Sequence, residues 1–483
     1  MQIDDLSLFR EQCYVDGQWT IADNGATFNV FNPADGTRLG KVPKMGKVET
    51  ARAIDAAEAA LTSWASKTAS ERSIILRKWY QLILENKQDL ATIMTAEMGK
   101  PKAEALSEIV YGASFIEWFA EESKRIYGDT IPAPSIDRRI VVIKQPIGVV
   151  ASITPWNFPN AMITRKCSPA LAAGCPVVIK PAEDTPFSAL ALAELAERAG
   201  IPKGVINVVT GKPKEIGDEM TVNPKVRKLS FTGSTPVGKL LMKQCAATVK
   251  KVSLELGGNA PFVVFEDADL DEAVAGAMAS KFRNTGQTCV CANRFLVHDS
   301  IHDAFTNKLV EAVKKLSLGS GMLSNVTQGP LINKKALDKV QTLVNDAIDK
   351  GAKVVLGGKR SDLGHTFFEP TIMTNLDNTM HMASEEIFGP IAALYRFKTE
   401  EEALKMANDT PFGLAAYFYS REIGRVWRFS EALEYGMIGV NAGTISSEVA
   451  PFGGIKESGI GREGSKFGIE EFLEVKYMCF GGL

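Results

Sequence analysis

Apolar residues recur at intervals of three and four through most of the first 130 positions of the chain. The clearest stretch is SIILRKWYQLILENKQDLATIM, residues 73–94. This spacing predicts an amphipathic helix, and Gly99 with Pro101 is a typical helix stop. We therefore expect the N-terminal region to be mostly helical.

The pattern changes at residues 138–158, RRIVVIKQPIGVVASITPWNF, which hold two β-branched runs broken at residues 146–148. These runs predict an extended ribbon. Helical stretches then alternate with short apolar strands, which read PVVIK, VINVVTG, VRKLSF and KVSLEL. Such alternation is typical of an α/β fold, a parallel sheet covered by helices on both faces and doubly wound as in dinucleotide-binding domains.

A second alternating series begins with FVVFEDADL and runs to about residue 445. The tail FLEVKYMCF then predicts an isolated strand without a local partner. Together with the ribbon near residues 130–146, it would leave unpaired edges that another subunit could cover.

Length and composition narrow the class of protein. A chain of 483 residues is too long for one core, and about three domains are expected. The net charge of −2 gives no reason to expect nucleic acid or a membrane surface as partner. The acidic start MQIDDLSLFREQ is unlike a signal peptide, and no apolar run approaches the roughly 20 residues that span a bilayer. We expect a cytoplasmic protein.

Two cysteines stand one residue apart in FRNTGQTCVCANR, residues 282–294. Seven cysteines, an odd number, do not resemble a disulfide framework. Only four histidines occur and no second Cys-x2-Cys pair exists, so we expect no metal site. A nucleophile or a redox switch remains.

A cysteine attacks only as the thiolate, so it needs a lowered pKa or a nearby base. Glu255, in VSLELGGNAP, is a candidate base at the end of a strand, although an ion-paired structural carboxylate would read the same. Asn157, in TPWNFPNAMITRK, could cap the helix that follows or donate a hydrogen bond to a developing oxyanion.

Two stretches suit a cofactor. KLSFTGSTPVGKLL places Gly233 and Gly238 at a strand-to-helix turn, where a phosphate could approach the helix N-terminus; a plain capped turn is the alternative. In VIKPAED, Glu183 follows a buried strand that ends at Lys180. A carboxylate there suits the hydroxyls of an adenosine ribose, although a surface Lys and Glu would look the same.

Seven motifs occur in an order and spacing that resemble the NAD(P)-dependent aldehyde dehydrogenase superfamily, from about residue 10 to the C-terminus. They are TPWNFP, KPAE, FTGS, LELGG, GQTCVCANR, EEIFGP and PFGGIKESGIGREG. The resemblance implies a Rossmann-type cofactor domain, an α/β catalytic domain and a small β oligomerisation element. The implied boundaries are 1–129 and 147–257 for the NAD-binding domain, 258–447 for the catalytic domain, and 130–146 with 448–483 for the oligomerisation ribbon and tail.

The resemblance also implies roles. Cys289 would be the nucleophile, Glu255 the general base, and Asn157 with the Cys289 backbone N–H the oxyanion hole, while Lys180 would hold the nicotinamide ribose. The aldehyde would be oxidised through a cysteine thiohemiacetal and a thioester. The implied cofactor contacts are Thr154, Pro155, Trp156, Lys180, Glu183, Gly233, Ser234, Leu256, Glu386 and Phe388.

Two arginines bear on the substrate. Relatives that oxidise simple aldehydes have an aromatic residue at the positions of Arg165 and Arg283, so two guanidinium groups imply an aldehyde with a terminal carboxylate. A salt-bridged structural arginine is the alternative for each. The remaining expected substrate contacts are Ser446, Phe158 and Phe452. We expect oxidation of succinate semialdehyde to succinate, as in 4-aminobutyrate degradation, with glutarate semialdehyde or a broader range of aldehydes as the alternative.

Further expectations concern cofactor choice, regulation and assembly. The Glu183 carboxylate would repel a 2′-phosphate, which favours NAD over NADP and leaves NADP open. Cys291 is either a small filler or the partner of Cys289 in a reversible regulatory bridge. The implied assembly is a homo-oligomer, a dimer of dimers. Cofactor-free ester hydrolysis and a non-catalytic scaffold are the rival functional classes.

Overall fold

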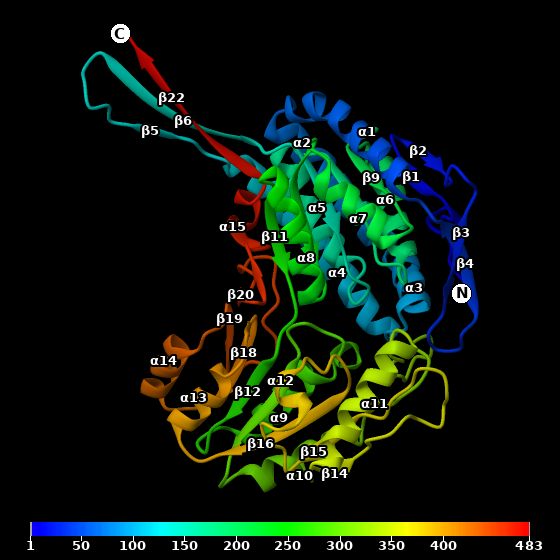
Figure 1. Cartoon of the computed structure of the whole chain (residues 1–483), viewed down its shortest axis with the longest axis vertical. Coiled ribbons are helices and arrows are strands. Elements are labelled where there is room, and N and C mark those ends of the chain that lie inside the picture. Colours follow the sequence, from blue (N-terminus) through cyan, green and yellow to red (C-terminus); the bar gives the residue numbers. More distant parts are fainter. Residues whose placement is uncertain (1, 483) are drawn as a thin grey trace.

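The structure is a computed structural model that describes residues 2–482. Two lobes, each built on its own large sheet, lie one above the other, and a three-stranded ribbon projects from the upper lobe (Figure 1). No helix between residues 2 and 482 is both long enough and apolar enough to cross a bilayer. Over the same residues, no group of three or more His, Cys, Asp or Glu side chains is placed to hold a metal ion.

The N-terminal region is less helical than expected, because residues 13–43 form strands. These are β1 (Cys13–Val15), β2 (Gln18–Thr20), β3 (Thr27–Phe31) and β4 (Arg38–Pro43). The helices that follow are α1 (Lys47–Ala65), α2 (Ala69–Glu85), α3 (Lys87–Met98) and α4 (Lys102–Glu122). The continuous pattern over residues 73–94 is thus divided between α2 and α3 at Asn86, while the predicted stop at Gly99 is confirmed by its left-handed φ of 90°.

The sheet of the first lobe has the strand order β2-β1-β9-β8-β7-β10-β11-β21. Its parallel centre consists of β7 (Val149–Ile153), β8 (Val177–Lys180), β9 (Ile206–Val208), β10 (Val226–Thr232) and β11 (Lys251–Glu255). The connecting helices are α5 (Ala161–Ala173), α6 (Pro186–Ala199), α7 (Pro213–Val222) and α8 (Thr235–Cys245). The β-branched run at residues 149–153 therefore enters this sheet and does not continue the ribbon.

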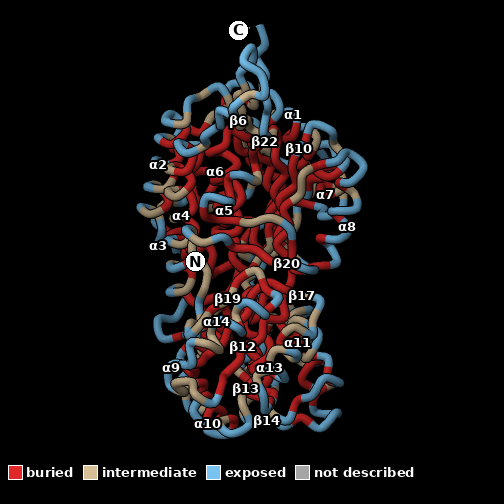
Figure 2. The backbone as a smooth tube through the Cα atoms, turned by 90° about the vertical axis from the view of Figure 1, so that its left-hand side faces the viewer, coloured by how far each residue is buried: buried red, intermediate tan, exposed pale blue. Residues whose placement is uncertain are grey.

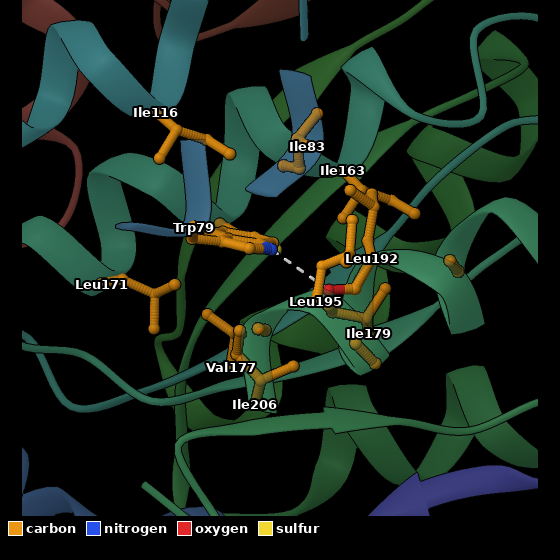
Figure 3. Close-up of a cluster of buried hydrophobic side chains, with 14 of the residues drawn as sticks. Trp79, Ile83, Ile116, Ile163, Leu171, Val177, Ile179, Leu192, Leu195 and Ile206 are labelled. Atoms are coloured by element: carbon orange, nitrogen blue, oxygen red, sulfur yellow. Dashed lines mark hydrogen bonds between the residues drawn. The ribbon is translucent and has the colours of Figure 1, made fainter. Parts of the chain in front are cut away.

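A buried apolar layer joins these helices to the sheet. Figure 3 shows Trp79 of α2 among side chains of α5, α6 and the strands β8 and β9. The indole Nε1 of Trp79 donates a hydrogen bond of 3.1 Å to the Leu192 carbonyl, so its one polar atom is satisfied inside the core. Truncation of such a residue to alanine costs about 3–5 kcal/mol of stability.

The second lobe holds a seven-stranded sheet of order β14-β15-β16-β13-β12-β18-β19. Its strands are β12 (Ala260–Val264), β13 (Ala292–His298), β14 (Lys353–Leu356), β15 (Thr371–Thr374), β16 (Ile391–Phe397), β18 (Ala415–Tyr419) and β19 (Met437–Val440). The helices are α9 (Leu270–Lys281), α10 (His302–Val313), α11 (Lys334–Asp349), α12 (His381–Ser384), α13 (Glu400–Asn408) and α14 (Ile423–Ala432). Buried backbone runs through both lobes (Figure 2).

The chain then returns to the first lobe. Strand β20 (Ile455–Lys456) pairs with β17 (Phe412–Gly413), and β21 (Gly459–Ile460) adds an antiparallel edge to β11, where Glu255 pairs with Gly459. Helix α15 (Ser465–Glu470) follows and leads into the last strand.

The sequence led us to expect an isolated C-terminal strand, but this strand has a partner. Strand β22 (Leu473–Gly481) pairs antiparallel with β6 (Arg138–Pro146) along its whole length, and β5 (Asp129–Ile131) pairs with the other edge of β6. A partner more than 300 residues away in sequence leaves no local signal. The ribbon carries exposed apolar side chains, among them Val475 and Tyr477, and most of its surface is exposed (Figure 2).

Candidate active site

The turn before Cys289 has an unusual backbone. After α9, the short helix η4 (Arg283–Gly286) contains Asn284 at φ 52°, Thr285 at φ 56° and Gly286 at φ 74°. A left-handed conformation is rare for a β-branched residue such as threonine and persists only where the surroundings impose it. A side chain at Gly286 would meet the Gly389 carbonyl oxygen at 2.2 Å, so glycine is required there.

Contacts with residues 329–332 hold this turn in place. The Thr285 hydroxyl donates to the Gly329 carbonyl at 3.2 Å, and the Ile332 backbone N–H donates to Gln287 Oε1 at 2.9 Å. The strained segment is therefore fixed from both ends, and Cys289 follows it at a defined position.

Cys289 is half-buried and lines a cavity of about 440 Å³ between the lobes. Burial raises the pKa of its thiol to about 12; the charge of Arg165 opposes this shift, while Glu386 and Glu255 add to it. The resting thiol is thus neutral at physiological pH, and attack on a carbonyl requires a group that takes its proton.

Asn157 follows β7 and belongs to the opposite lobe, yet it contacts the Cys289 turn. Its Nδ2 donates to the Gln287 carbonyl at 3.2 Å, and its Oδ1 accepts from the Phe158 backbone N–H at 3.1 Å. An amide nitrogen carries two hydrogens, so one N–H remains for a ligand. This geometry suits the predicted oxyanion donor.

Glu255 is only 2% exposed, and neither carboxylate oxygen has a hydrogen-bond partner within residues 2–482. Burial raises its pKa well above the usual range, the charge of Glu463 raises it further, and Arg165 and Lys166 oppose the shift. The alternative was that Glu255 is a structural carboxylate held in an ion pair. Among the described residues, no cation forms an ion pair with Glu255. Glu255 does not itself line the Cys289 cavity.

Seven of the ten predicted cofactor contacts line the Cys289 cavity. They are Pro155, Trp156, Gly233, Ser234, Leu256, Glu386 and Phe388. Thr154, Lys180 and Glu183 do not. Lys180 Nζ lies 2.5 Å from Glu183 Oε1, and the Glu183 side chain is 41% exposed and lines a neighbouring cavity of about 400 Å³.

The cavity fits a nicotinamide dinucleotide. Helix α8 begins at its wall, and among residues 2–482 no side chain caps that N-terminus, so free N–H groups are available for a diphosphate. Lys335 and Lys339 add positive charge from α11. Glu386, whose pKa burial raises to about 7, offers a carboxylate for sugar hydroxyls.

The two predicted substrate arginines differ in their surroundings. Arg165 is buried, its Nη2 lies 2.7 Å from Glu463 Oε2, and its guanidinium stacks at 4.0 Å over Phe452. Arg165 is thus salt-bridged in the structure, as in the alternative interpretation. Its Nε, however, lacks a hydrogen-bond partner among residues 2–482.

Arg283 is half-buried and lies 5.2 Å over Phe158, and in the described part of the chain no carboxylate is within ion-pair distance of it. Its charge nevertheless lowers the pKa of Glu104, which burial raises. Arg283 and Ser446 line one small void of about 10 Å³ together with Thr288, whose hydroxyl has no partner in residues 2–482. Such a void holds one water at most.

The sequence reasoning missed three residues of this region: Tyr111, Lys166 and Glu463. Burial raises the pKa of Tyr111 while Arg165 and Arg283 both lower it, and its buried hydroxyl has no partner within residues 2–482. Glu463 lies in the quoted motif PFGGIKESGIGREG, so a signal was present, and it pairs with Lys166 at 2.5 Å. Tyr111 gave no signal beyond its place on an amphipathic helix.

Cys291 is buried beneath the turn. Its Sγ donates to the carbonyls of Lys281 and Ala292, each at 3.5 Å, and burial raises the pKa of the thiol. Both Cys289 and Cys291 are free thiols. The regulatory bridge stays a prediction.

Comparison with known proteins decides the family. The sequence model described as "Aldehyde dehydrogenase family" matches residues 19–478. The chain belongs to the aldehyde dehydrogenase family. This confirms the expected fold and an NAD(P)-linked aldehyde dehydrogenase activity.

Relatives within the family match the chain over its whole length. The glutarate-semialdehyde dehydrogenase of Pseudomonas aeruginosa is 63% identical, with 100% of each chain covered. The NADP-dependent succinate-semialdehyde dehydrogenase GabD of Escherichia coli is 62% identical, again with 100% of each covered. The crystal structure of succinate-semialdehyde dehydrogenase from Burkholderia pseudomallei gives a TM-score of 0.99 at 63% identity and 100% coverage of both chains.

Proposed function

We propose that this aldehyde dehydrogenase oxidises a short aldehyde with a terminal carboxylate, with succinate semialdehyde as the first candidate and glutarate semialdehyde as the second. The observation that carries the proposal is Arg283, which has no carboxylate within ion-pair distance among residues 2–482 and lines a void together with the unpartnered Thr288 hydroxyl. A half-buried guanidinium without an ion-pair partner is free to bind an anion, and a substrate carboxylate would supply one. The names of the Pseudomonas aeruginosa and Escherichia coli relatives support the same substrate class.

The residues supply most of the chemistry. Cys289 would attack the aldehyde carbon once its proton is removed, and the negative charge that develops on oxygen would be stabilised by the free N–H of Asn157 and by the Cys289 backbone N–H. Glu255 would be the base, because burial raises the pKa of this carboxylate and so makes it a stronger proton acceptor.

A bound nicotinamide cofactor would supply the acceptor for the hydride, the one function for which the chain has no group of its own. The carbonyl carbon would then be held on Cys289 as a thioester. Glu255 would deprotonate the water that releases the acid, and the thiol would be restored. Lys180 would hold the nicotinamide ribose.

For the cofactor we propose a preference for NAD, because a carboxylate at Glu183 accepts from two ribose hydroxyls and repels a 2′-phosphate. The Escherichia coli relative is named for NADP, so a preference for NAD would distinguish the present chain from that relative. We also propose that the exposed edges of β5 and β22 pair in a homo-oligomer, a dimer of dimers.

The test of the substrate is a comparison of kcat/KM for succinate semialdehyde, glutarate semialdehyde and an uncharged aldehyde of equal length. We expect both semialdehydes to be preferred by about 10- to 150-fold, since a charged hydrogen bond contributes roughly 1.5–3 kcal/mol. Discrimination between the two semialdehydes should be of similar size or less, because one methylene is worth about 1–3 kcal/mol. Equal use of the uncharged aldehyde would refute the proposal.

A further inference from the structure

The two predicted oxyanion donors come from different lobes, so their relative position depends on contacts across the cleft. The Gln287 carbonyl, two residues before Cys289, accepts from Asn157 Nδ2 and from Asn284 Nδ2, each at 3.2 Å. The Asn157 carbonyl in turn accepts from Asn284 Nδ2 at 3.0 Å. Two of these hydrogen bonds join Asn157 to the strained turn, and the third, from Asn284 to Gln287, lies within the turn.

A lysine outside the cavity adds a third hydrogen bond to Asn157. Lys100 lies between α3 and α4, and its Nζ donates to the Asn157 carbonyl at 2.8 Å. The same Nζ forms an ion pair with Glu108 and lies 4.0 Å from the centre of the Phe158 ring. The side chains of Lys100 and Glu108 are each 1% exposed. A buried ion pair is expensive to form, and here its cation is directed at one carbonyl of the site.

The neighbouring carboxylates of α4 extend this contact to both lobes. The second oxygen of Glu108 accepts from the backbone N–H groups of Asn160 at 3.0 Å and Ala161 at 3.2 Å, where α5 begins. Glu104, one turn earlier on α4, accepts from the Asn284 backbone N–H at 2.7 Å. One face of α4 therefore holds the segment that carries Asn157 and the turn that carries Cys289.

We propose that Lys100, held by Glu108, is a positioning residue that sets the Asn157 amide at hydrogen-bonding distance from an oxyanion on Cys289. Lys100 does not line the Cys289 cavity, and although its Nζ also lies over the Phe158 ring, its hydrogen bond to the site is the one to the Asn157 carbonyl, so it acts through Asn157. The inference rests on the proposed thiol chemistry but not on the identity of the aldehyde.

The test is a double-mutant cycle with Lys100→Met and Asn157→Ala, with Lys102→Met as the matched control at the half-buried start of α4. We expect Lys100→Met to lower kcat by up to about 100-fold, the effect of a displacement of about 1 Å in a catalytic site. KM for the aldehyde should change little. In the Asn157→Ala background the same substitution should change kcat by less than about twofold, because coupled residues are not additive.

Two further measurements separate positioning from general damage. Alkylation of Cys289 by iodoacetamide does not need the oxyanion donors, so its rate should be unchanged in Lys100→Met. Hydrolysis of 4-nitrophenyl acetate uses the thiol and the oxyanion donors without cofactor, and it should fall in parallel with kcat. This ester assay also tests Lys100 if the semialdehydes prove not to be substrates.

Additive losses in the double mutant, or an equal loss of alkylation, would overturn the proposal. If Lys100→Met does not fold, Glu104→Gln provides the second variant, since its side chain is half-buried and its contact reaches the turn directly. For that variant we expect a smaller fall in kcat with unchanged alkylation; an unchanged kcat would also contradict the role of this face of α4.

Discussion

The cofactor side and the substrate side of Cys289 are built in different ways. The cofactor side is an open cavity of about 440 Å³ whose walls are strand ends, a helix N-terminus and a few side chains. The substrate side is closed to about 10 Å³, and charged groups dominate it: Arg165 is paired with Glu463, while Arg283 has no such partner in the described residues. The backbone thus shapes the cofactor side, and charged side chains shape the substrate side. Mutations should therefore affect cofactor use and substrate use separately.

The largest effect is expected at the residue the two sides share. Cys289→Ala should abolish both aldehyde oxidation and ester hydrolysis, because no other accessible thiol lines the cavity within residues 2–482. Quenching of Trp156 fluorescence by the cofactor should persist, since the cofactor side remains intact. Residual turnover in this variant would point to a different nucleophile.

The two arginines give the next largest effect. Arg283→Met should lower kcat/KM for semialdehydes by about 10- to 150-fold, the equivalent of roughly 1.5–3 kcal/mol, and leave an uncharged aldehyde unaffected. Arg165→Met should also lower thermal stability, because it leaves the buried Glu463 with one cation fewer.

The measurements are kcat/KM for succinate semialdehyde, glutarate semialdehyde and the uncharged aldehyde, together with a melting curve for each variant. Equal losses on charged and uncharged aldehydes in Arg283→Met would contradict its role as the carboxylate contact.

A smaller effect is expected at the edge of the cofactor side. Glu183→Ser should narrow the preference for NAD over NADP by about fivefold, since the side chain is partly exposed and solvent screens its charge. The ratio of kcat/KM for the two cofactors is the measurement, and an unchanged ratio would refute the role of Glu183. The matched control is Asp184→Asn in the neighbouring cavity.

The smallest effect concerns stability and pH. Because the folded protein raises the pKa of Glu255, the folded state binds this proton more tightly than the unfolded chain does, and stability falls as pH rises above the unfolded value of about 4.3. Glu255→Gln should therefore melt at a higher temperature than the parent at pH 8 and at the same temperature near pH 4. A lower melting temperature at pH 8 would show that the carboxylate is stabilised by contacts beyond those described.

Seven of the ten residues that the motifs assigned to the cofactor line one cavity, because strand ends, turns and helix starts leave local patterns; their role as cofactor contacts stays a prediction. The turn at Gly233 and the stop at Gly99 are examples of such patterns. The role of Arg165 as a substrate contact also stays a prediction, and its pairing with Glu463, nearly 300 residues away, could not be read from spacing. The same holds for β22, which pairs with β6, and for Lys100, whose role depends on where α4 packs. Turns and helix ends can therefore be predicted from the local sequence, whereas pairings between residues far apart in the chain are known only once the fold is known.

The edge strand β21 has a consequence for synthesis of the protein. Residues 459 and 460 complete the sheet beside the strand that bears Glu255, so this edge of the first lobe can close only after residue 460 has been synthesised. The second lobe, inserted between, can fold earlier as a unit. The strand that bears Glu255 therefore gains its last neighbour only after the lobe that carries Cys289 has been synthesised.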